Sequence, residues 1–343
     1  MPPIRVILWA TGKVGAAAGR TLARDPRFRI VGARVYGEDK HGRDVGELLG
    51  VPVIGVKATT DTAEILRTPA EAVVHAPRGH HRSEQHDLDV CALLESGKNV
   101  LSTCGYFNCA AFGDEHATRM HAAGVRGNAT LSGVGMSPGF VAERMLAALT
   151  GACVRIDALS LIETIDCTGI AEWILERMGF GATPEKYAGS GLANAFDDFY
   201  GQVVHTVMRT LGAAPERIEC RHECIAAGED FGGAALPIPR GHVQATARRW
   251  LGYRGGRPFF TMELRWLVGT IPGWSQGSGW DFAIDGTPPL RMRLGYGPAS
   301  EGYDATAMGY DMMSGIIVNT LPAIVAAPPG IFTAPVFAPY RFH

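Results

Sequence analysis

The sequence lacks an apolar stretch long enough to cross a membrane, and neither sign of charge is in excess. A spanning helix needs about 20 consecutive apolar residues. The longest apolar region, 315–332, is broken by polar, proline and glycine residues: Asn319, Pro322, Pro328, Pro329 and Gly330. The formal net charge of −2 gives no electrostatic reason to expect nucleic acid or an anionic membrane as a partner. We therefore expect a soluble, cytoplasmic protein that acts on a small molecule.

Cysteine is too sparse for a disulfide framework. Seven cysteines in a chain of 343 residues are typical of reduced thiols. Cys220, His222 and Cys224 lie close together, but no second pair of ligands follows them, and a closed zinc site needs four ligands. Cys104 and Cys109 also lack a partner cluster. The sequence therefore predicts no metal.

The amino-terminal half alternates apolar runs with helical patterns. Ile4–Trp9 is almost continuously apolar, which is typical of a strand buried on both faces and, with its single Arg5, not of a signal peptide. Val14–Arg24 follows as a helix. The next expected elements are strand Phe28–Tyr36, strand Ala72–Ala76, a helix capped by Ser83, strand Asn99–Thr103, helix His116–Ala123 and strand Gly127–Gly133. This order predicts an α/β fold with a Rossmann-type, doubly wound parallel sheet over residues 1–140.

Longer alternating strands are expected after residue 140. Val154–Ile165 alternates apolar and polar residues, as a strand with one buried face does. His242–Leu251 and Phe259–Val268 are expected to pair as a hairpin. Residues 141–304 are therefore predicted to form an α+β substrate and dimerisation domain. Residues 305–343 are predicted to pack back on the first domain, with a helix over Ala305–Ile324.

The junction between the first strand and the first helix resembles a dinucleotide-binding G-x-G-x-x-G turn in sequence and in context. Gly12 would let backbone N–H groups approach phosphates, Gly15 would let the helix pack closely on the sheet, and the helix N-terminus supplies partial positive charge. Ala10 replaces the first glycine, which the turn tolerates if the backbone torsions there are ordinary. The predicted phosphate-binding residues are Ala10, Thr11, Gly12, Lys13, Val14 and Gly15.

The end of the second strand bears on the choice of dinucleotide. An acidic residue there usually binds the ribose hydroxyls of NAD, but this strand ends at Tyr36 with no carboxylate at its tip. Arg34, Lys40 and Arg43 would supply positive charge for a 2′-phosphate, although they could equally form a solvated loop. We predict NADP, with NAD possible, and expect Arg34, Tyr36 and Lys40 to contact it.

Several further stretches carry a family resemblance. They are Arg34–Leu48, Val73–Pro77, Gly97–Cys104, Gly133–Phe140 and Val318–Gly330. Together with the turn, they resemble the dihydrodipicolinate-reductase-like family that includes 2,4-diaminopentanoate dehydrogenase and the native amine dehydrogenases. The resemblance implies a Rossmann domain, a substrate domain inserted before a returning C-terminal helix, and a homodimer.

The chain also departs from that family. Dihydrodipicolinate reductases carry a His-His stretch and a lysine in the substrate domain, and neither has an equivalent after residue 150. The family's amine dehydrogenases usually place a glutamate after the stretch that ends here at Cys104, where this chain has Gly105 and Tyr106. Their Asn-Pro-Gly is replaced by Ser137–Gly139.

Hydride transfer requires a substrate carbon beside the nicotinamide and a polar group that handles the proton. Tyr106 is the first candidate, or else only an aromatic wall. Glu163 could replace the missing carboxylate, or else face solvent. Residues at the ends of the central strands are expected beside the nicotinamide: His75, Ala76, Pro77, Thr103 and Cys104. Those expected to bind substrate are Met136, Ser137 and Phe140, and a loop with His80 and His81 is expected to flank the cofactor.

These features predict an NAD(P)-dependent, amine-dehydrogenase-like oxidoreductase. It would transfer hydride between NADP(H) and the C=N or C=O carbon of a small to medium hydrophobic substrate. Two alternatives stay open: a carbonyl/alcohol oxidoreductase with Tyr106 as proton donor, and a dinucleotide-binding protein without catalysis.

Overall fold

The computed structural model describes residues 2–78, 82–190, 197–233, 235–298, 300 and 303–342. His80 and His81 lie outside this part of the chain. Two compact units are formed, the first by Met1–Phe140 with Ala299–Pro335 and the second by Val141–Pro298 with Val336–His343.

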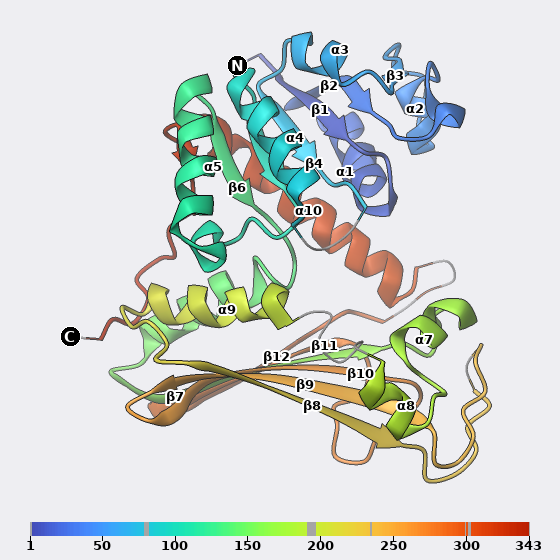
Figure 1. Cartoon of the computed structure of the whole chain (residues 1–343), viewed down its shortest axis with the longest axis vertical. Helices are drawn as coiled ribbons and strands as arrows, with labels where there is room; N and C mark the ends of the chain where they lie inside the picture. Colours follow the sequence, from blue (N-terminus) through green and yellow to red (C-terminus); the bar gives the residue numbers. More distant parts are fainter. Residues whose placement is uncertain are drawn as a thin grey trace. The chain divides into compact units, whose positions relative to one another are not determined.

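The first unit is built on a parallel sheet (Figure 1) with strand order β13-β6-β5-β4-β1-β2-β3. Each described pair of neighbouring strands in it is parallel. The strands are β1 Ile4–Trp9, β2 Phe28–Arg34, β3 Ala58–Thr59, β4 Ala72–His75, β5 Asn99–Ser102, β6 Thr130–Gly133 and β13 Gly330–Ile331. The helices are α1 Lys13–Arg24, α2 Val45–Leu49, α3 Thr62–Arg67, α4 Glu84–Glu95, α5 Asp114–Gly127 and α10 Ala305–Ala326, with short 3₁₀ turns Glu38–Lys40 and Cys109–Phe112.

Alternate residues of β1 enter two separate cores, one on each face of this sheet. Val6 and Leu8 pack in the core that contains apolar residues of α1, α2 and α10. Ile7 and Trp9 pack in the core that contains residues of α3, α4 and α5. Helices on both faces of a parallel sheet define the doubly wound arrangement, so the predicted fold class is confirmed.

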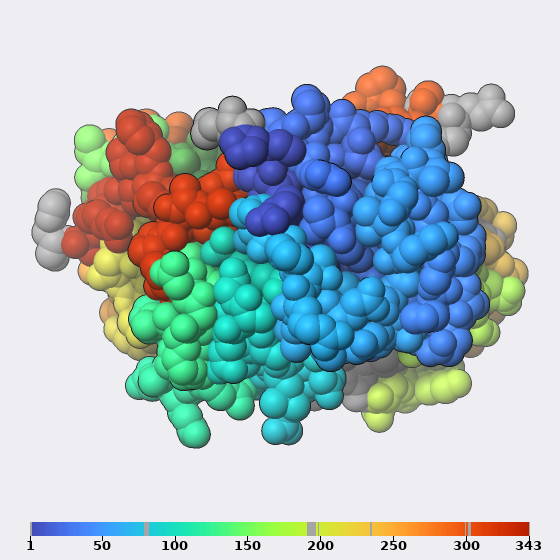
Figure 2. Space-filling view, turned by 90° about the horizontal axis from the view of Figure 1, so that it is seen from above, coloured from blue at the N-terminus to red at the C-terminus, as the bar shows by residue number. Residues whose placement is uncertain are grey.

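The C-terminal segment divides between the units. The predicted closing helix is present as α10, and after it Gly330 N donates to Ala129 O and Ile331 N to His121 Nδ1. Figure 2 shows this red segment lying beside the green of α5. Residues 336–343 instead belong to the second unit, unlike the prediction, because Tyr340 N donates to Thr150 Oγ1 within that unit.

The second unit contains a six-stranded mixed sheet with order β12-β11-β7-β10-β9-β8. The strands are β7 Arg155–Asp166, β8 Ile218–Ala226, β9 Val243–Arg254, β10 Arg257–Leu267, β11 Gly279–Thr287 and β12 Leu290–Gly295. The predicted hairpin is confirmed as β9 and β10, which turn at Gly255 and Gly256. β7 runs parallel to β10 and antiparallel to β11, so it occupies the middle of the sheet.

Helix α9 (Asp197–Thr210) packs against one face of this sheet, where Gly252 leaves room for Val204 and Met208. The other helical segments are the π-helix Val141–Leu146, α6 Ala147–Leu149, the 3₁₀ turn Thr150–Ala152, α7 Glu172–Met178 and α8 Pro184–Gly189. None of the described helices combines the length and apolar character needed to cross a membrane.

Candidate active site

The turn between β1 and α1 has the backbone of a dinucleotide-binding turn, although its first residue is not glycine. Ala10 has φ +84°, in the left-handed region that favours glycine. The expectation of ordinary torsions at Ala10 is therefore wrong. Helix α1 approaches this residue closely, because a Cβ on Gly15 would lie 2.2 Å from Ala10 O. Ala10 thus adopts a backbone conformation that is strained for alanine. Gly15 is glycine because the backbone of α1 contacts the backbone of the turn there.

The turn combines open space beside Gly12 with polar groups of the kind that bind phosphate. A Cβ on Gly12 would meet nothing within 4 Å. The N-terminus of α1 has neither a side-chain cap nor an acidic residue in its first turn, so its N–H groups are available to an anion. Within the described residues, the buried Thr11 Oγ1 also lacks a hydrogen-bond partner. Lys13, on the first turn of α1, is exposed.

Arg34 and Tyr36 lie together at the end of β2. The Arg34 guanidinium is 4.8 Å from the Tyr36 ring centroid, and Nε donates to Thr62 Oγ1 at 3.1 Å. Tyr36 is more than half exposed, and its Oη accepts from Trp9 Nε1. Lys40 is half-buried in the following 3₁₀ turn. These groups supply a cation and an exposed ring where the adenosine end of a dinucleotide lies in this fold.

The residues at the carboxyl ends of β4 and β5 bind one another. His75 is fully buried, and its Nδ1 lies 2.9 Å from Ser102 Oγ. Burial, with a smaller effect of His86, lowers the pKa of His75 to about 3, so the ring is neutral at physiological pH. Its Nε2 has no partner among the described residues. Thr103 N donates to His75 O at 2.9 Å.

Cys104 is buried beside this strand end. Its Sγ lies 3.9 Å from Pro77 O, and burial raises the pKa of the thiol to about 11. Ala76, which precedes Pro77, is also buried. Cys104 therefore packs as an uncharged, apolar side chain between the loops that follow β4 and β5.

Tyr106 occupies a different environment from the one expected of a proton donor. It is almost completely buried, and its hydroxyl donates to Asp87 Oδ1 at 2.7 Å. Asp87 also binds Arg82, Arg119 and His116. Burial and the hydrogen bond to Asp87 raise the pKa of Tyr106 strongly. The geometry therefore favours a structural role for Tyr106, as a buried ring hydrogen-bonded to a cluster of charged side chains, over a role as proton donor.

The loop after β6 follows the same edge of the sheet. A Cβ on Gly133 would lie 2.2 Å from the carbonyl carbon of Tyr106, so backbone packs on backbone there. Met136 O accepts from Phe140 N at 3.3 Å, and both residues are half-buried. Ser137 Oγ is buried and has no partner within the described residues.

A second polar cluster lies in the second unit, on the sheet face that carries α9. Directly opposed residues of neighbouring strands point to the same face of a sheet. One such row crosses β9, β10, β7 and β11 and consists of Arg248, Leu264, Glu163 and Trp280. Glu163 and Arg248 are both almost completely buried. Glu163 therefore does not face solvent, but lies in the sheet interior with a cation in its row.

Two tyrosines lie close enough to this carboxylate to respond to its charge. Tyr200, on α9, is buried, and its ring packs against Trp250 with centroids 5.0 Å apart and the planes tilted by 31°. Burial raises the pKa of Tyr200, the charges of Glu163 and Glu143 raise it further, and Arg248 opposes them. Burial, with a smaller effect of Glu163, raises the pKa of Tyr296 to about 12. Both phenols are therefore protonated at neutral pH.

Sequence reasoning missed Arg248, Tyr200 and Glu143. Arg248 could have been noticed, since two consecutive arginines interrupt an apolar strand and one of them must point inward. Tyr200 and Glu143 give no such signal, because their positions in helical segments do not reveal which part of the sheet they approach.

The carboxy-terminal part of the chain decides the family. Residues 140–337 match the model described as the 2,4-diaminopentanoate dehydrogenase C-terminal domain, which is more than half of the chain. The chain belongs to this family. The resemblance found in the sequence is thereby confirmed.

Known proteins are also similar to this chain over nearly its whole length. An amine dehydrogenase of Streptomyces virginiae is 26% identical over 96% of this chain and 95% of its own. The structure of the amine dehydrogenase from Mycobacterium smegmatis has TM-score 0.76 and 22% identity, with 97% of this chain and 98% of that chain covered. GenD2 of gentamicin A biosynthesis, solved with NAD, has TM-score 0.54 and 17% identity over 94% and 87%. The chain is an NAD(P)-dependent oxidoreductase related to amine dehydrogenases.

Proposed function

We propose that this enzyme interconverts a hydrophobic primary amine and the corresponding ketone or aldehyde with NADP(H), and that Glu163 handles the proton on nitrogen. The observation that carries this proposal is the buried carboxylate of Glu163 on an aromatic face of the second unit. The cofactor supplies or accepts the hydride. The S. virginiae relative is called an amine dehydrogenase, which supports amine chemistry here.

The required proton steps suit a carboxylate. An ammonium substrate must lose a proton before its carbon can give up hydride, and water then converts the iminium to carbonyl and ammonium. A buried carboxylate can pair with the substrate cation and take its proton. Glu163 is the candidate for this base. The neighbouring Arg248 and Tyr200 would orient it.

Aromatic side chains define the expected substrate class. Trp280 lies directly opposite Glu163, and Phe282 lies opposite Leu161 on the same face. Trp250 and Trp266 belong to this face through β9 and β10. These rings are buried, and buried indole and phenyl rings beside one carboxylate favour an amine with an apolar body over a polar amino acid.

Carbonyl reduction without ammonia is the second candidate. Tyr106 does not support it, because its hydroxyl is held by Asp87. Tyr200 and Tyr296 stay protonated and could donate to a carbonyl oxygen. Turnover of hydrophobic ketones with and without ammonium separates the two, since amine chemistry requires ammonium in the reductive direction.

The test of Glu163 is the variant Glu163→Gln, assayed in both directions. A general base contributes about 10²- to 10⁴-fold, so we expect kcat to fall about 100-fold or more while NADPH still binds. Thr164→Val is the matched control, because Thr164 is buried at the adjacent position of β7 and its hydroxyl has no described partner. Full activity in Glu163→Gln would exclude the role.

Two further proposals concern the choice of dinucleotide and the oligomeric state. Arg34, Tyr36 and Lys40 support a preference for NADP over NAD, because they offer positive charge and no carboxylate at the tip of β2. A homodimer is implied by the family resemblance, and sedimentation equilibrium of the purified chain tests it.

A further inference from the structure

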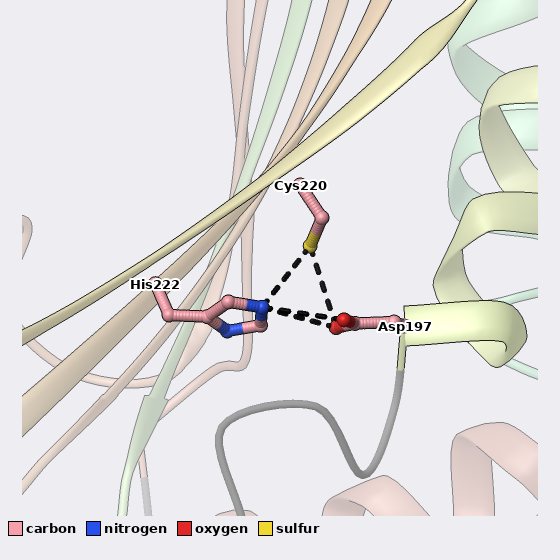
Figure 3. A group of neighbouring side chains, drawn as sticks. All are labelled: Asp197, Cys220 and His222. Carbon is pink, nitrogen blue, oxygen red and sulfur yellow. Dashed lines mark hydrogen bonds and ion pairs between the residues drawn. The ribbon is translucent and has the colours of Figure 1, made fainter. Parts of the chain in front are cut away.

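Three side chains of metal-binding type meet between β8 and the first residue of α9, all within the second unit (Figure 3). Cys220 and His222 lie two positions apart on β8 and therefore share one face of the strand. Asp197 approaches them from α9, and Trp250 Nε1 holds its backbone oxygen at 3.1 Å. Asp197 precedes Cys220 by 23 residues and His222 by 25 residues in the sequence.

The three ligand atoms form a nearly equilateral triangle. Cys220 Sγ lies 3.3 Å from Asp197 Oδ1 and 3.4 Å from His222 Nε2, and that nitrogen lies 3.3 Å from the carboxylate. Ligands bound tetrahedrally to zinc at the usual bond lengths lie about 3.3–3.6 Å apart. The side chains are therefore already spaced as three corners of a zinc tetrahedron.

The same contacts argue against a nucleophilic triad. In such a triad the carboxylate binds the imidazole nitrogen remote from the nucleophile. Here Asp197 and Cys220 both approach Nε2 of His222. The three groups converge on one point, which suits a shared cation and not a proton relay.

We propose that Asp197, Cys220 and His222 bind a zinc-like transition-metal ion and leave its fourth position open to water or another ligand. A thiolate with an imidazole and a carboxylate suits zinc or cobalt, and the sulfur disfavours magnesium and calcium. On binding, the thiol of Cys220 loses its proton to solvent, and the sulfur–metal bond replaces the hydrogen bond to Asp197.

The site would have a structural effect that is independent of the proposed amine chemistry. β8 is an edge strand of the sheet, and a metal ion would fasten it to the first turn of α9. His222 is opposed to Arg248 on β9, the residue that shares a row with Glu163. The ion would thus fix the end of the helix whose Tyr200 lies over the buried cluster.

The direct test is titration of the reduced, metal-free full-length chain with cobalt(II) chloride. We expect one equivalent to bind with a thiolate-to-cobalt charge-transfer band and intense d–d bands of a four-coordinate ion, and zinc sulfate to displace it. Cys220→Ser should lose the charge-transfer band. Cys224→Ser is the matched control, because this half-buried thiol lies on the same face of β8 outside the triangle, and it should keep the full band.

Thermal stability is a second measurement of metal binding, for variants whose cobalt binding is weak for other reasons. Zinc should raise the Tm of the wild type and of Cys224→Ser in a concentration-dependent manner, since a ligand that binds only the folded state stabilises it. His222→Ala should fold, as judged by circular dichroism, but show no zinc-dependent shift. The proposal is overturned if the wild type gives no thiolate band, if the band survives in Cys220→Ser, or if it is lost in Cys224→Ser.

Discussion

Two glycines of the β1–α1 turn should respond differently to the same added methyl group: both variants should bind the dinucleotide more weakly, but only Gly15→Ala should also lose stability. Gly12→Ala adds a methyl group where the structure has nothing within 4 Å, at a φ of −73° that alanine adopts freely. The free protein should tolerate it. The added group fills the space proposed for the pyrophosphate, however, so binding of the dinucleotide should suffer.

Gly15→Ala should behave differently, because its Cβ would lie 2.2 Å from Ala10 O. Strand and helix must then separate by about 1 Å, and overpacking of this kind costs about 1–3 kcal/mol. For Gly12→Ala we expect a change in unfolding free energy within about 0.5 kcal/mol. Loss of one charge-assisted phosphate contact costs about 1.5–3 kcal/mol, or about 10- to 100-fold in Kd.

The assay pairs urea unfolding of the free chain with NADPH titration followed by fluorescence. Gly12→Ala should keep the wild-type unfolding midpoint and bind NADPH about 10- to 100-fold more weakly. Gly15→Ala should lose both stability and binding. Wild-type affinity in Gly12→Ala would refute the proposal that this turn binds the phosphates.

Three further predictions follow from the first unit. Arg34→Ala should reduce kcat/KM for NADPH about 10- to 100-fold and leave that for NADH nearly unchanged; equal losses would contradict a 2′-phosphate site. His75 has its pKa lowered to about 3 by burial, so it contributes stability above about pH 6.5 that is lost as pH falls toward 3. His75→Asn should therefore flatten the pH dependence of the unfolding free energy by up to about 1.4 kcal/mol per pH unit, and an unchanged slope would argue against a buried neutral ring. Asp87→Asn should lower the unfolding free energy measured in urea by about 1.5–3 kcal/mol, because Tyr106, Arg82 and Arg119 lose a charged hydrogen-bond partner, whereas Asp89→Asn on the same helix should change it little.

The fold could be predicted because its signals are local. The apolar run of Ile4–Trp9, the turn at Gly12 and Gly15, and the Gly255–Gly256 hairpin each depend on a few adjacent residues. The conformation of Ala10 could not be predicted in the same way. Its positive φ occurs where α1 packs closely on the backbone of the turn, and the residues around Ala10 give no local signal for it.

The site was harder to predict because its partners are distant in the sequence. Tyr106 stands near the place of the family's missing glutamate, but whether its hydroxyl faces a substrate or Asp87 depends on how α4 packs beside its loop. Asp197 precedes Cys220 by 23 residues, and no periodicity connects them. Only the fold of α9 over the sheet brings these groups together.

The proposed function makes this chain an enzyme that forms and oxidises amines with NADP(H). The most direct measurement is the rate of NADPH oxidation with a panel of hydrophobic ketones and aldehydes, with and without ammonium, followed by identification of the product. We predict oxidation that depends on ammonium and yields the primary amine. Turnover that does not depend on ammonium and yields an alcohol would contradict the proposed function. So would the absence of turnover despite tight NADPH binding.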